Sequence, residues 1–205
     1  MAALTFFQNI RWVQSVSRAV CTLALLLMVD FISPATGENS LYPHCRGRDI
    51  LTAPVCRGDQ IDPEEQNLYT LINEYRDRHG LPPIPLSPAL NQVANRHILD
   101  LVHNVGYLTH GWSDCPYHAS QPATYACMWN APQRLGTTYP GNGYENAYEG
   151  PRKATATGTL ATWQQSHLHR AVILNEGIWA TKTWQALGIG IYEKYAVVWF
   201  GEEVD

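Results

Sequence analysis

The C-terminal end of the chain carries the pattern that most constrains its fold, two short runs of β-branched and aromatic residues. The runs span residues 187–192 and 195–200, and only Glu193 and Lys194 separate them. These residue types favour extended backbone, and a two-residue connection suits a tight turn, so the pattern predicts an antiparallel hairpin. A further strand is harder to place, and residues 144–148 are the best candidate for one end of it.

A first helix is predicted well before the hairpin. Asp62 is a good helix cap, and Pro63 and Glu65 complete the start signal of an apolar-faced segment. Gly80 ends this helix. The proline-rich residues 81–85 that follow are incompatible with a helix and are predicted to form an extended connector.

A second helix is predicted from Ser87-Pro88, which repeats the same start signal. His97 lies on its apolar stripe. Because buried polar side chains normally have a hydrogen-bond partner, we interpret His97 as a core-face residue rather than as a ligand. Helices that come first and paired strands that come last predict an α+β domain with helices packed on the sheet. The apolar stripe of this second predicted helix, on which His97 lies, consists of Leu90, Val93, Ala94, Ile98 and Leu101.

The first 35 residues are predicted to be a secretory signal peptide. Arg11 and Arg18 precede an apolar run at 19–29, and Ser33-Pro34-Ala35 offers small residues for signal peptidase. That run has 11 residues, whereas a bilayer-spanning helix needs about 20. An uncleaved anchor is the alternative. In either case the rest of the chain is expected outside the membrane, without stable insertion, in an extracellular or periplasmic compartment.

Cysteine usage also indicates an oxidising compartment. Cys21 lies in the predicted signal, and the remaining four cysteines predict two disulfides. A longer loop is entropically harder to close, so the pairs Cys45–Cys56 and Cys115–Cys127 are favoured over the other two connectivities. A four-cysteine zinc site is the alternative, although no pair has the short Cys-x-x-Cys spacing of such sites.

The remainder of the chain is the right size for one domain with a real core, at about 170 residues. We predict an irregular arm at 36–61, followed by the domain at 62–205. Without the charges of the signal, this part has 12 basic and 17 acidic residues, a net charge near −5. It has no basic patch, so a nucleic acid is not an expected partner.

Five motif segments follow one another along the chain. They are Gly80-Leu81-Pro82-Pro83 to Leu86-Ser87-Pro88-Ala89-Leu90, Ala94-Asn95-Arg96-His97, Gly143-Tyr144-Glu145-Asn146, Ser166 to Arg170, and Gly188-Ile189-Gly190. In this order they resemble the CAP superfamily of cysteine-rich secretory proteins, antigen 5 and pathogenesis-related proteins, over residues 64–201. The resemblance implies a three-layer α-β-α sandwich of the CAP/SCP type, with a shallow cleft lined by histidine and glutamate.

The resemblance assigns three residues to that cleft. The family's first cleft histidine matches His110. The glutamate of its Gly-Glu-Asn motif matches Glu145, although Tyr144 stands where the family has a glycine. The second histidine matches His169, in a segment that resembles the Ser-x-x-His-Arg form of bacterial members.

The fourth cleft residue of the family has no counterpart in this chain. Members with a full set carry a second glutamate shortly after a helix tryptophan, but here Trp163 is followed by Gln164, Gln165 and Ser166. Acid/base chemistry by two carboxylates needs two carboxyl groups with separated pKa values. Because the second glutamate is missing, the sequence does not support acid/base catalysis of this kind.

The three cleft residues suggest a metal site. Two imidazoles and one carboxylate are enough ligands for zinc or another divalent cation, with one position left for water. The residues come from three separate segments, however, without the short spacing of recognisable zinc motifs. The alternative is a hydrogen-bonded network that ties helix, loop and sheet together.

Ser166 raises a nucleophilic alternative. It lies three residues before His169, so the two side chains would share a helix face, and Glu145 would orient the imidazole. Against this, the chain has no Gly-x-Ser-x-Gly elbow, and a serine here more often caps the next helix. Asn146 is a supporting candidate, and Arg170 is expected to position a carboxylate or a backbone carbonyl.

Residues 111–140 form a long stretch rich in aromatic side chains between His110 and the glutamate motif. Because the stretch starts directly after His110 and ends just before Glu145, we expect a loop fastened by the second disulfide as a wall or lid of the cleft. The alternative is that its aromatic residues supply a local hydrophobic core. A polar groove lined by aromatic residues would bind a small ligand, either a lipid, a glycan or a peptide.

Three classes of function are open on this basis. A secreted binding module is the leading interpretation, because it needs only the cleft. A metal-dependent or serine-type hydrolase is the second. A disulfide-stabilised structural or toxin-like extracellular protein is the third.

Overall fold

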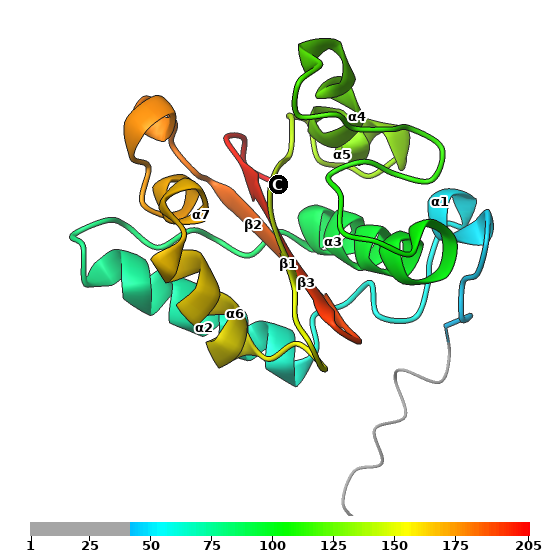
Figure 1. Cartoon of the computed structure of the whole chain (residues 1–205), viewed down its shortest axis with the longest axis horizontal. Coiled ribbons are helices and arrows are strands. Elements are labelled where there is room, and N and C mark those ends of the chain that lie inside the picture. Colours follow the sequence, from blue (N-terminus) through cyan, green and yellow to red (C-terminus); the bar gives the residue numbers. More distant parts are fainter. Residues whose placement is uncertain (1–41) are drawn as a thin grey trace, which may run out of the picture. The chain divides into compact units, whose positions relative to one another are not determined.

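The computed structural model describes residues 42–205. The predicted signal peptide, Cys21 and residues 36–41 of the predicted arm lie outside them. Helices cover both faces of a three-stranded sheet (Figure 1), which confirms the α+β class and the three layers. The elements are α1 (Asp49–Thr52), α2 (Pro63–Asp77), α3 (Pro88–Asp100), the π-helical turn η2 (Leu101–Val105), the 3-10 turn η3 (Pro122–Thr124), α4 (Ala126–Trp129), α5 (Ala131–Arg134), β1 (Tyr144–Glu149), α6 (Ala156–Gln165), α7 (His167–Ile173), the 3-10 turn η4 (Gly177–Trp179), β2 (Ala186–Tyr192) and β3 (Tyr195–Gly201).

The sheet is antiparallel and has the order β1-β3-β2. The predicted hairpin is confirmed, with β2 and β3 paired from Ala186 opposite Gly201 to Tyr192 opposite Tyr195. Its turn places Glu193 at a φ of 52°. The strand suspected around residues 144–148 is β1, which pairs with β3 and lies at an edge of the sheet.

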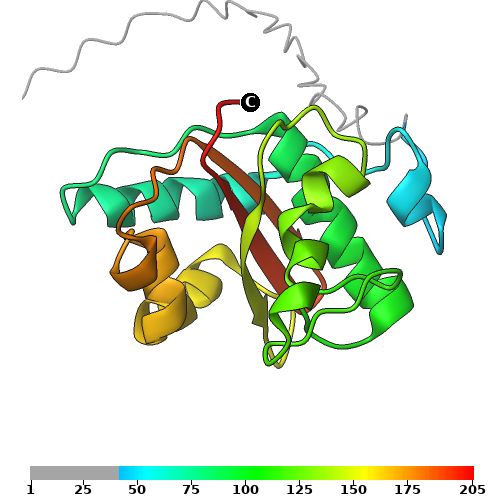
Figure 2. The same ribbon diagram turned by 90° about the horizontal axis from the view of Figure 1, so that it is seen from above.

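Each face of the sheet has its own hydrophobic core. Successive side chains of a strand point to opposite faces, so Val198 and Phe200 join one core while Val197 and Trp199 join the other. The first core is completed by α2, α6 and α7, and the second by α3 (Figure 2). Both faces of β3 are therefore apolar, as its unbroken hydrophobic sequence requires.

Two glycines of β2 let α3 approach the sheet closely. A Cβ on Gly188 would lie 2.1 Å from the carbonyl carbon of Leu90, and one on Gly190 would lie 2.8 Å from that of Ala94. The side chain of Asn91 uses this proximity, because its Oδ1 accepts a hydrogen bond of 2.8 Å from the amide of Ile189. The closeness fixes the position of α3, and with it the position of His97.

The long helices begin where the sequence predicted. Asp62 and Glu65 form the capping box of α2 with two bonds of 2.8 Å, and the Ser87 hydroxyl caps α3 by accepting from the amide of Leu90 at 2.9 Å. The α3 helix continues into the π-helical turn η2, which ends at Gly106 with a φ of 84°. Among residues 42–205, no helix combines the length and apolar content of a membrane span.

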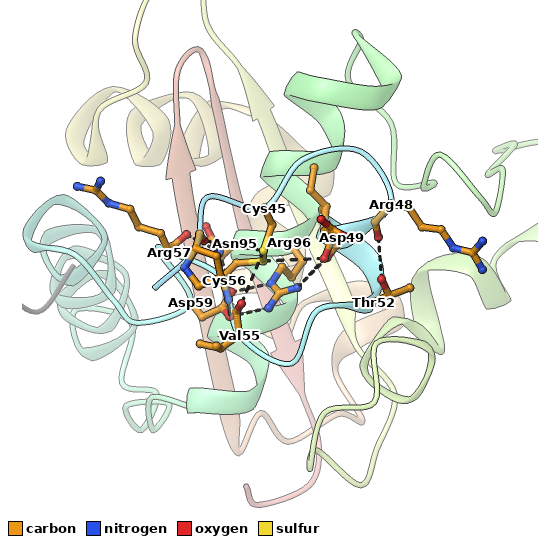
Figure 3. Close-up of a disulfide and its surroundings, with 12 residues drawn as sticks. Cys45, Arg48, Asp49, Thr52, Val55, Cys56, Arg57, Asp59, Asn95 and Arg96 are labelled. Carbon is orange, nitrogen blue, oxygen red and sulfur yellow. Dashed lines mark hydrogen bonds and ion pairs between the residues drawn. A yellow bond between two sulfur atoms is a disulfide. The ribbon is translucent and has the colours of Figure 1, made fainter. Parts of the chain in front are cut away.

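Both predicted disulfides are confirmed, Cys45–Cys56 in the arm and Cys115–Cys127 in the aromatic stretch. The arm is also held by α3, as Figure 3 shows. Arg96, which is 1% exposed, donates to both carboxylate oxygens of Asp59, at 2.8 and 2.7 Å. A bidentate pair of this kind fixes the geometry of the contact between the arm and α3, in addition to the constraint from the disulfide within the arm.

Candidate functional site

The site is built around Glu145 on the edge strand β1. Glu145 lies opposite Trp199 of β3, and its side chain is fully buried on the α3 face of the sheet. A buried carboxylate needs compensation for its lost hydration. Here two histidines provide it, one for each carboxylate oxygen.

His97 of α3 is the first of these histidines. Its Nδ1 lies 2.5 Å from Oε1 of Glu145, and its Nε2 lies 2.9 Å from the backbone carbonyl oxygen of Gly111. A carbonyl oxygen only accepts, so Nε2 carries a proton, and the second proton of the pair lies between Nδ1 and the carboxylate. His97 and Glu145 thus form a buried, charge-assisted hydrogen bond.

His110 is the second histidine. Its Nδ1 lies 2.7 Å from Oε2 of Glu145, and its side chain is 30% exposed. Because the other carboxylate oxygen serves His97, the simplest arrangement has His110 donating its Nδ1 proton to Oε2. The Nε2 atom of a neutral His110 then carries a free lone pair.

The electrostatics of this network agree with its hydrogen bonds. Burial alone would raise the pKa of Glu145, but the charge of His97 and the hydrogen bonds from both histidines outweigh it and lower the pKa to about 2. Burial would likewise lower the pKa of His97, but the charge and hydrogen bond of Glu145 raise it above its usual value. The carboxylate and the His97 cation therefore stabilise each other.

His169 approaches from the other layer of the molecule. It lies on α7, where its Nδ1 is 2.7 Å from the hydroxyl oxygen of Ser166, and its backbone carbonyl accepts a hydrogen bond of 2.9 Å from Nδ2 of Asn146. Burial, together with the nearby charge of His110, lowers the pKa of His169. Neighbouring residues of β1 thus contact opposite layers, Glu145 toward α3 and Asn146 toward α7.

The nucleophilic arrangement considered from the sequence is not formed. Ser166 and His169 do meet, but Glu145 is bonded to His97 and His110 and does not orient His169. The two residues do not share one continuous helix either, since α6 ends at Gln165 and α7 begins at His167. Ser166 occupies the cap position of α7, yet its hydroxyl binds the imidazole instead of capping the backbone.

The remaining supporting residues act on local structure. Arg170 lies 3.5 Å from the carboxylate of Glu176, and both side chains are partly exposed. The role of His97 was only partly visible in the sequence. Its helical spacing identified a buried histidine that needs a partner, but the partner lies 48 residues away on another element.

The donor set can be compared with the needs of a metal ion. Both oxygens of Glu145 are occupied by histidine nitrogens, so Glu145 is not free to be a direct ligand in this arrangement. Within residues 42–205, no three His, Cys, Asp or Glu side chains are grouped as a metal site would require. The Nδ1 atoms of His110 and His169 are both engaged in hydrogen bonds, so the Nε2 atoms of these two imidazoles are the donors that remain.

Some aromatic side chains of residues 111–140 are buried in the hydrophobic core, and others lie beside the site. Trp112 and Tyr139 are buried in the α3-side core. Three other rings are half-buried and form a row that starts at His110: Tyr117 meets His110 edge-on at 5.1 Å, Tyr125 stacks on Tyr117 at 5.1 Å, and Trp129 meets Tyr125 at 5.6 Å. The disulfide Cys115–Cys127 closes this segment.

Comparison with known proteins identifies the family. The model of the cysteine-rich secretory protein family, CAP, matches residues 69–178, which is more than half of the chain and includes His110, Glu145 and His169. The chain belongs to the CAP family. The resemblance inferred from the motifs is thereby confirmed at the level of the family. A search of curated proteins gave no match.

The solved structures that this chain is similar to have low sequence identity to it. An extracellular protein of Bacillus anthracis that contains an SCP domain has 22% identity and a TM-score of 0.54, over 70% of this CAP chain. The chain spans only 45% of that protein. An outer surface protein of Borrelia burgdorferi has 20% identity and a TM-score of 0.49, over 70% of this chain and 96% of its own length.

Proposed function

We propose that this CAP protein is exported and that its cleft binds a ligand instead of catalysing a reaction. Export is supported by the predicted signal peptide, by the two disulfides, which are typical of oxidising compartments, and by the extracellular description of the Bacillus anthracis protein. On this proposal, the Ser166 to Arg170 segment is the bacterial form of the family's second histidine motif. The compartment is extracellular or periplasmic.

The hydrogen bonds of Glu145 are the observation that favours binding over catalysis. Both oxygens of Glu145 are engaged by His97 and His110, so the single carboxylate of the cleft is not available as a general acid, general base or nucleophile. The same bonds orient His110. A carboxylate that accepts from one ring nitrogen fixes the tautomer and makes the other nitrogen a better donor.

We propose that Nε2 of His110 binds a divalent cation. Nε2 of His110 and Nε2 of His169 would hold zinc or a similar ion, with water or a second ligand at the remaining positions. His169 suits the role, since its lowered pKa favours the neutral imidazole that a metal needs. When bound, the ion would supply a positive charge for an anionic or carbonyl group of a further ligand.

Isothermal titration of zinc into the metal-free protein tests this proposal. We expect one site, and we expect both His110→Ala and His169→Ala to weaken zinc binding at least about tenfold, since each removes a ligand. Glu145→Gln should weaken it about 10- to 100-fold, as outer-shell partners of metal ligands do. His167→Ala is the matched control, because His167 is exposed and adjacent to the site. Zinc affinity unchanged in both ligand variants would overturn the proposal.

A further inference from the structure

A pocket lies beside His110 and is not part of the His110–Glu145–His169 cluster. Its volume is about 450 Å³, within the range of small-ligand sites. Thr109 and Gly111, the two neighbours of His110 in sequence, both line it. Tyr117 lines it as well and contacts the His110 ring edge-on, so the pocket adjoins the proposed metal ligand.

Two tyrosines give the pocket its aromatic surface. Tyr107 is 64% exposed, one of the large hydrophobic side chains left open to solvent, and Tyr117 is half-buried. The ring of Tyr125 stacks on the ring of Tyr117, and the angle between the two ring planes is 18°. Exposed tyrosine rings combine an apolar face with a polar hydroxyl, the combination found at recognition surfaces.

Polar groups between the tyrosines retain hydrogen-bonding capacity. Both amide protons of Asn104 are used, toward Gly47 and Asp100, which leaves its Oδ1 as an acceptor at the pocket. The Thr109 hydroxyl accepts from the amide of Gly111 and keeps its proton for donation. Asp114 pairs with Arg134 through one oxygen, so its other oxygen remains an acceptor.

The pocket is held in shape by buried contacts. Asp100 is fully buried, and its carboxylate accepts from the amide and hydroxyl of Ser113 and from the side chain of Asn104, each at 2.7 Å. The disulfide Cys115–Cys127 fixes the segment that carries Tyr117. A ligand would therefore enter a preformed site and lose less free energy to ordering of the protein.

The charges of the residues that line the pocket restrict the class of ligand that it can bind. Among the described residues that line this pocket there is no lysine or arginine, and one carboxylate, Asp114, is present. Apart from His118, the described lining residues therefore offer no basic side chain to a phosphate or other strongly anionic group, and Asp114 would repel it. A lipid chain would leave the polar groups of Asn104, Thr109 and Asp114 without partners, which is unfavourable.

We propose that this pocket binds a neutral oligosaccharide. A pyranose ring has an apolar C–H face that stacks on tyrosine, and its hydroxyls both donate and accept, which matches the mixed groups of Asn104, Thr109 and Asp114. The proposal goes beyond the proposed metal site, because this pocket adjoins that site but is lined by other residues. It places the sugar next to His110, where a bound cation would contact its oxygens.

A glycan microarray followed by titration tests the proposal. The full chain, produced in an oxidising host, is applied to neutral glucose and N-acetylglucosamine oligomers, to anionic heparin fragments and to lipid vesicles. We expect binding to at least one neutral series. We expect Tyr107→Ala to weaken it roughly 3- to 10-fold through loss of a stacking ring, and Tyr107→Phe to retain it within about twofold.

Controls separate this proposal from the metal proposal and from misfolding. Tyr192→Ala is matched, because Tyr192 is also exposed, at 41%, but lies on β2 outside this pocket. Tyr107 is exposed, so its replacement should leave the melting temperature unchanged. Zinc binding without binding of any neutral oligosaccharide would overturn this proposal and leave the metal proposal standing. Binding to heparin or vesicles alone, or equal sugar binding by Tyr107→Ala, would also overturn it.

Discussion

At the scale of single residues, the central feature is a histidine inside the core with oxygen atoms at both ring nitrogens. His97 is fully buried, and it pairs with Glu145 and with the carbonyl of Gly111. Breaking such a buried pair by removing one partner leaves the other charge without compensation. His97 is thus needed to keep Glu145 ionised and His110 oriented.

His97→Gln should lower the free energy of unfolding by about 3 kcal/mol near pH 5 to 6, measured by urea unfolding in the presence of a chelator. The raised pKa of His97 gives stabilisation that is complete below its unfolded value of 6.5 and is lost as pH rises through the folded value. The lowered pKa of Glu145 gives stabilisation that is complete above 4.5 and is lost as pH falls toward about 2.

The difference between wild type and His97→Gln should therefore be largest between about pH 4.5 and 6.5. Burial raises the pKa of Glu65 to about 8, so its own contribution declines between pH 4.5 and 8, but it does so in both proteins and cancels in the difference. His167→Gln is the control at an exposed histidine. A difference that does not vary with pH would show that His97 carries no charge in the folded protein.

At the scale of elements, the contact of α3 with β2 sets the geometry of the site. Gly188 leaves no room for a side chain against the backbone of Leu90, and this closeness places His97 over the sheet. On the opposite side of β1, Asn146 holds the backbone of α7 at His169. The two histidine-bearing segments are therefore fixed by contacts to the sheet itself.

Gly188→Ala should destabilise the protein by more than about 3 kcal/mol, because the added Cβ overlaps backbone atoms that cannot rotate away. Thermal unfolding measures the effect. Gly158→Ala on α6 is the matched control, since the nearest atom to its Cβ is the Thr155 hydroxyl at 3.0 Å, a side-chain atom that can adjust, and the expected change is below about 1 kcal/mol. Equal stability of the two variants would contradict the close packing of α3.

Features decided by neighbouring residues were predictable from the sequence. The caps at Asp62 and Ser87, the hairpin turn at Glu193 and both disulfide pairs depend on local spacing, and all of them are present. The partner of His97 was not predictable, because a helix and a strand 48 residues apart meet there only after β2 and α3 have packed. The sequence favoured Ser166 as the cap residue of a new helix, and it lies at that position between α6 and α7, but the bond of its hydroxyl to His169 was not predictable as a replacement for capping.

At the scale of the whole molecule, the site spans the edge of the sheet between two separate cores. His110 reaches Glu145 from the α3 side, and His169 comes from the α6 and α7 side. A cation or ligand bound to both would connect the two outer layers across β1, so binding should stabilise the fold as a whole.

The protonation of the histidine rings tests the central claim most directly. In a long-range nitrogen-15 NMR spectrum of the metal-free protein at pH 6, we expect His97 with protons on both ring nitrogens and His110 with a proton on Nδ1, where it faces Glu145. Glu145→Gln should change both assignments and leave the exposed His118 unaffected. A neutral His97 together with a His110 whose only ring proton is on Nε2 would contradict the account, because Nδ1 would then not donate to Glu145 and Nε2 would have no lone pair for a cation.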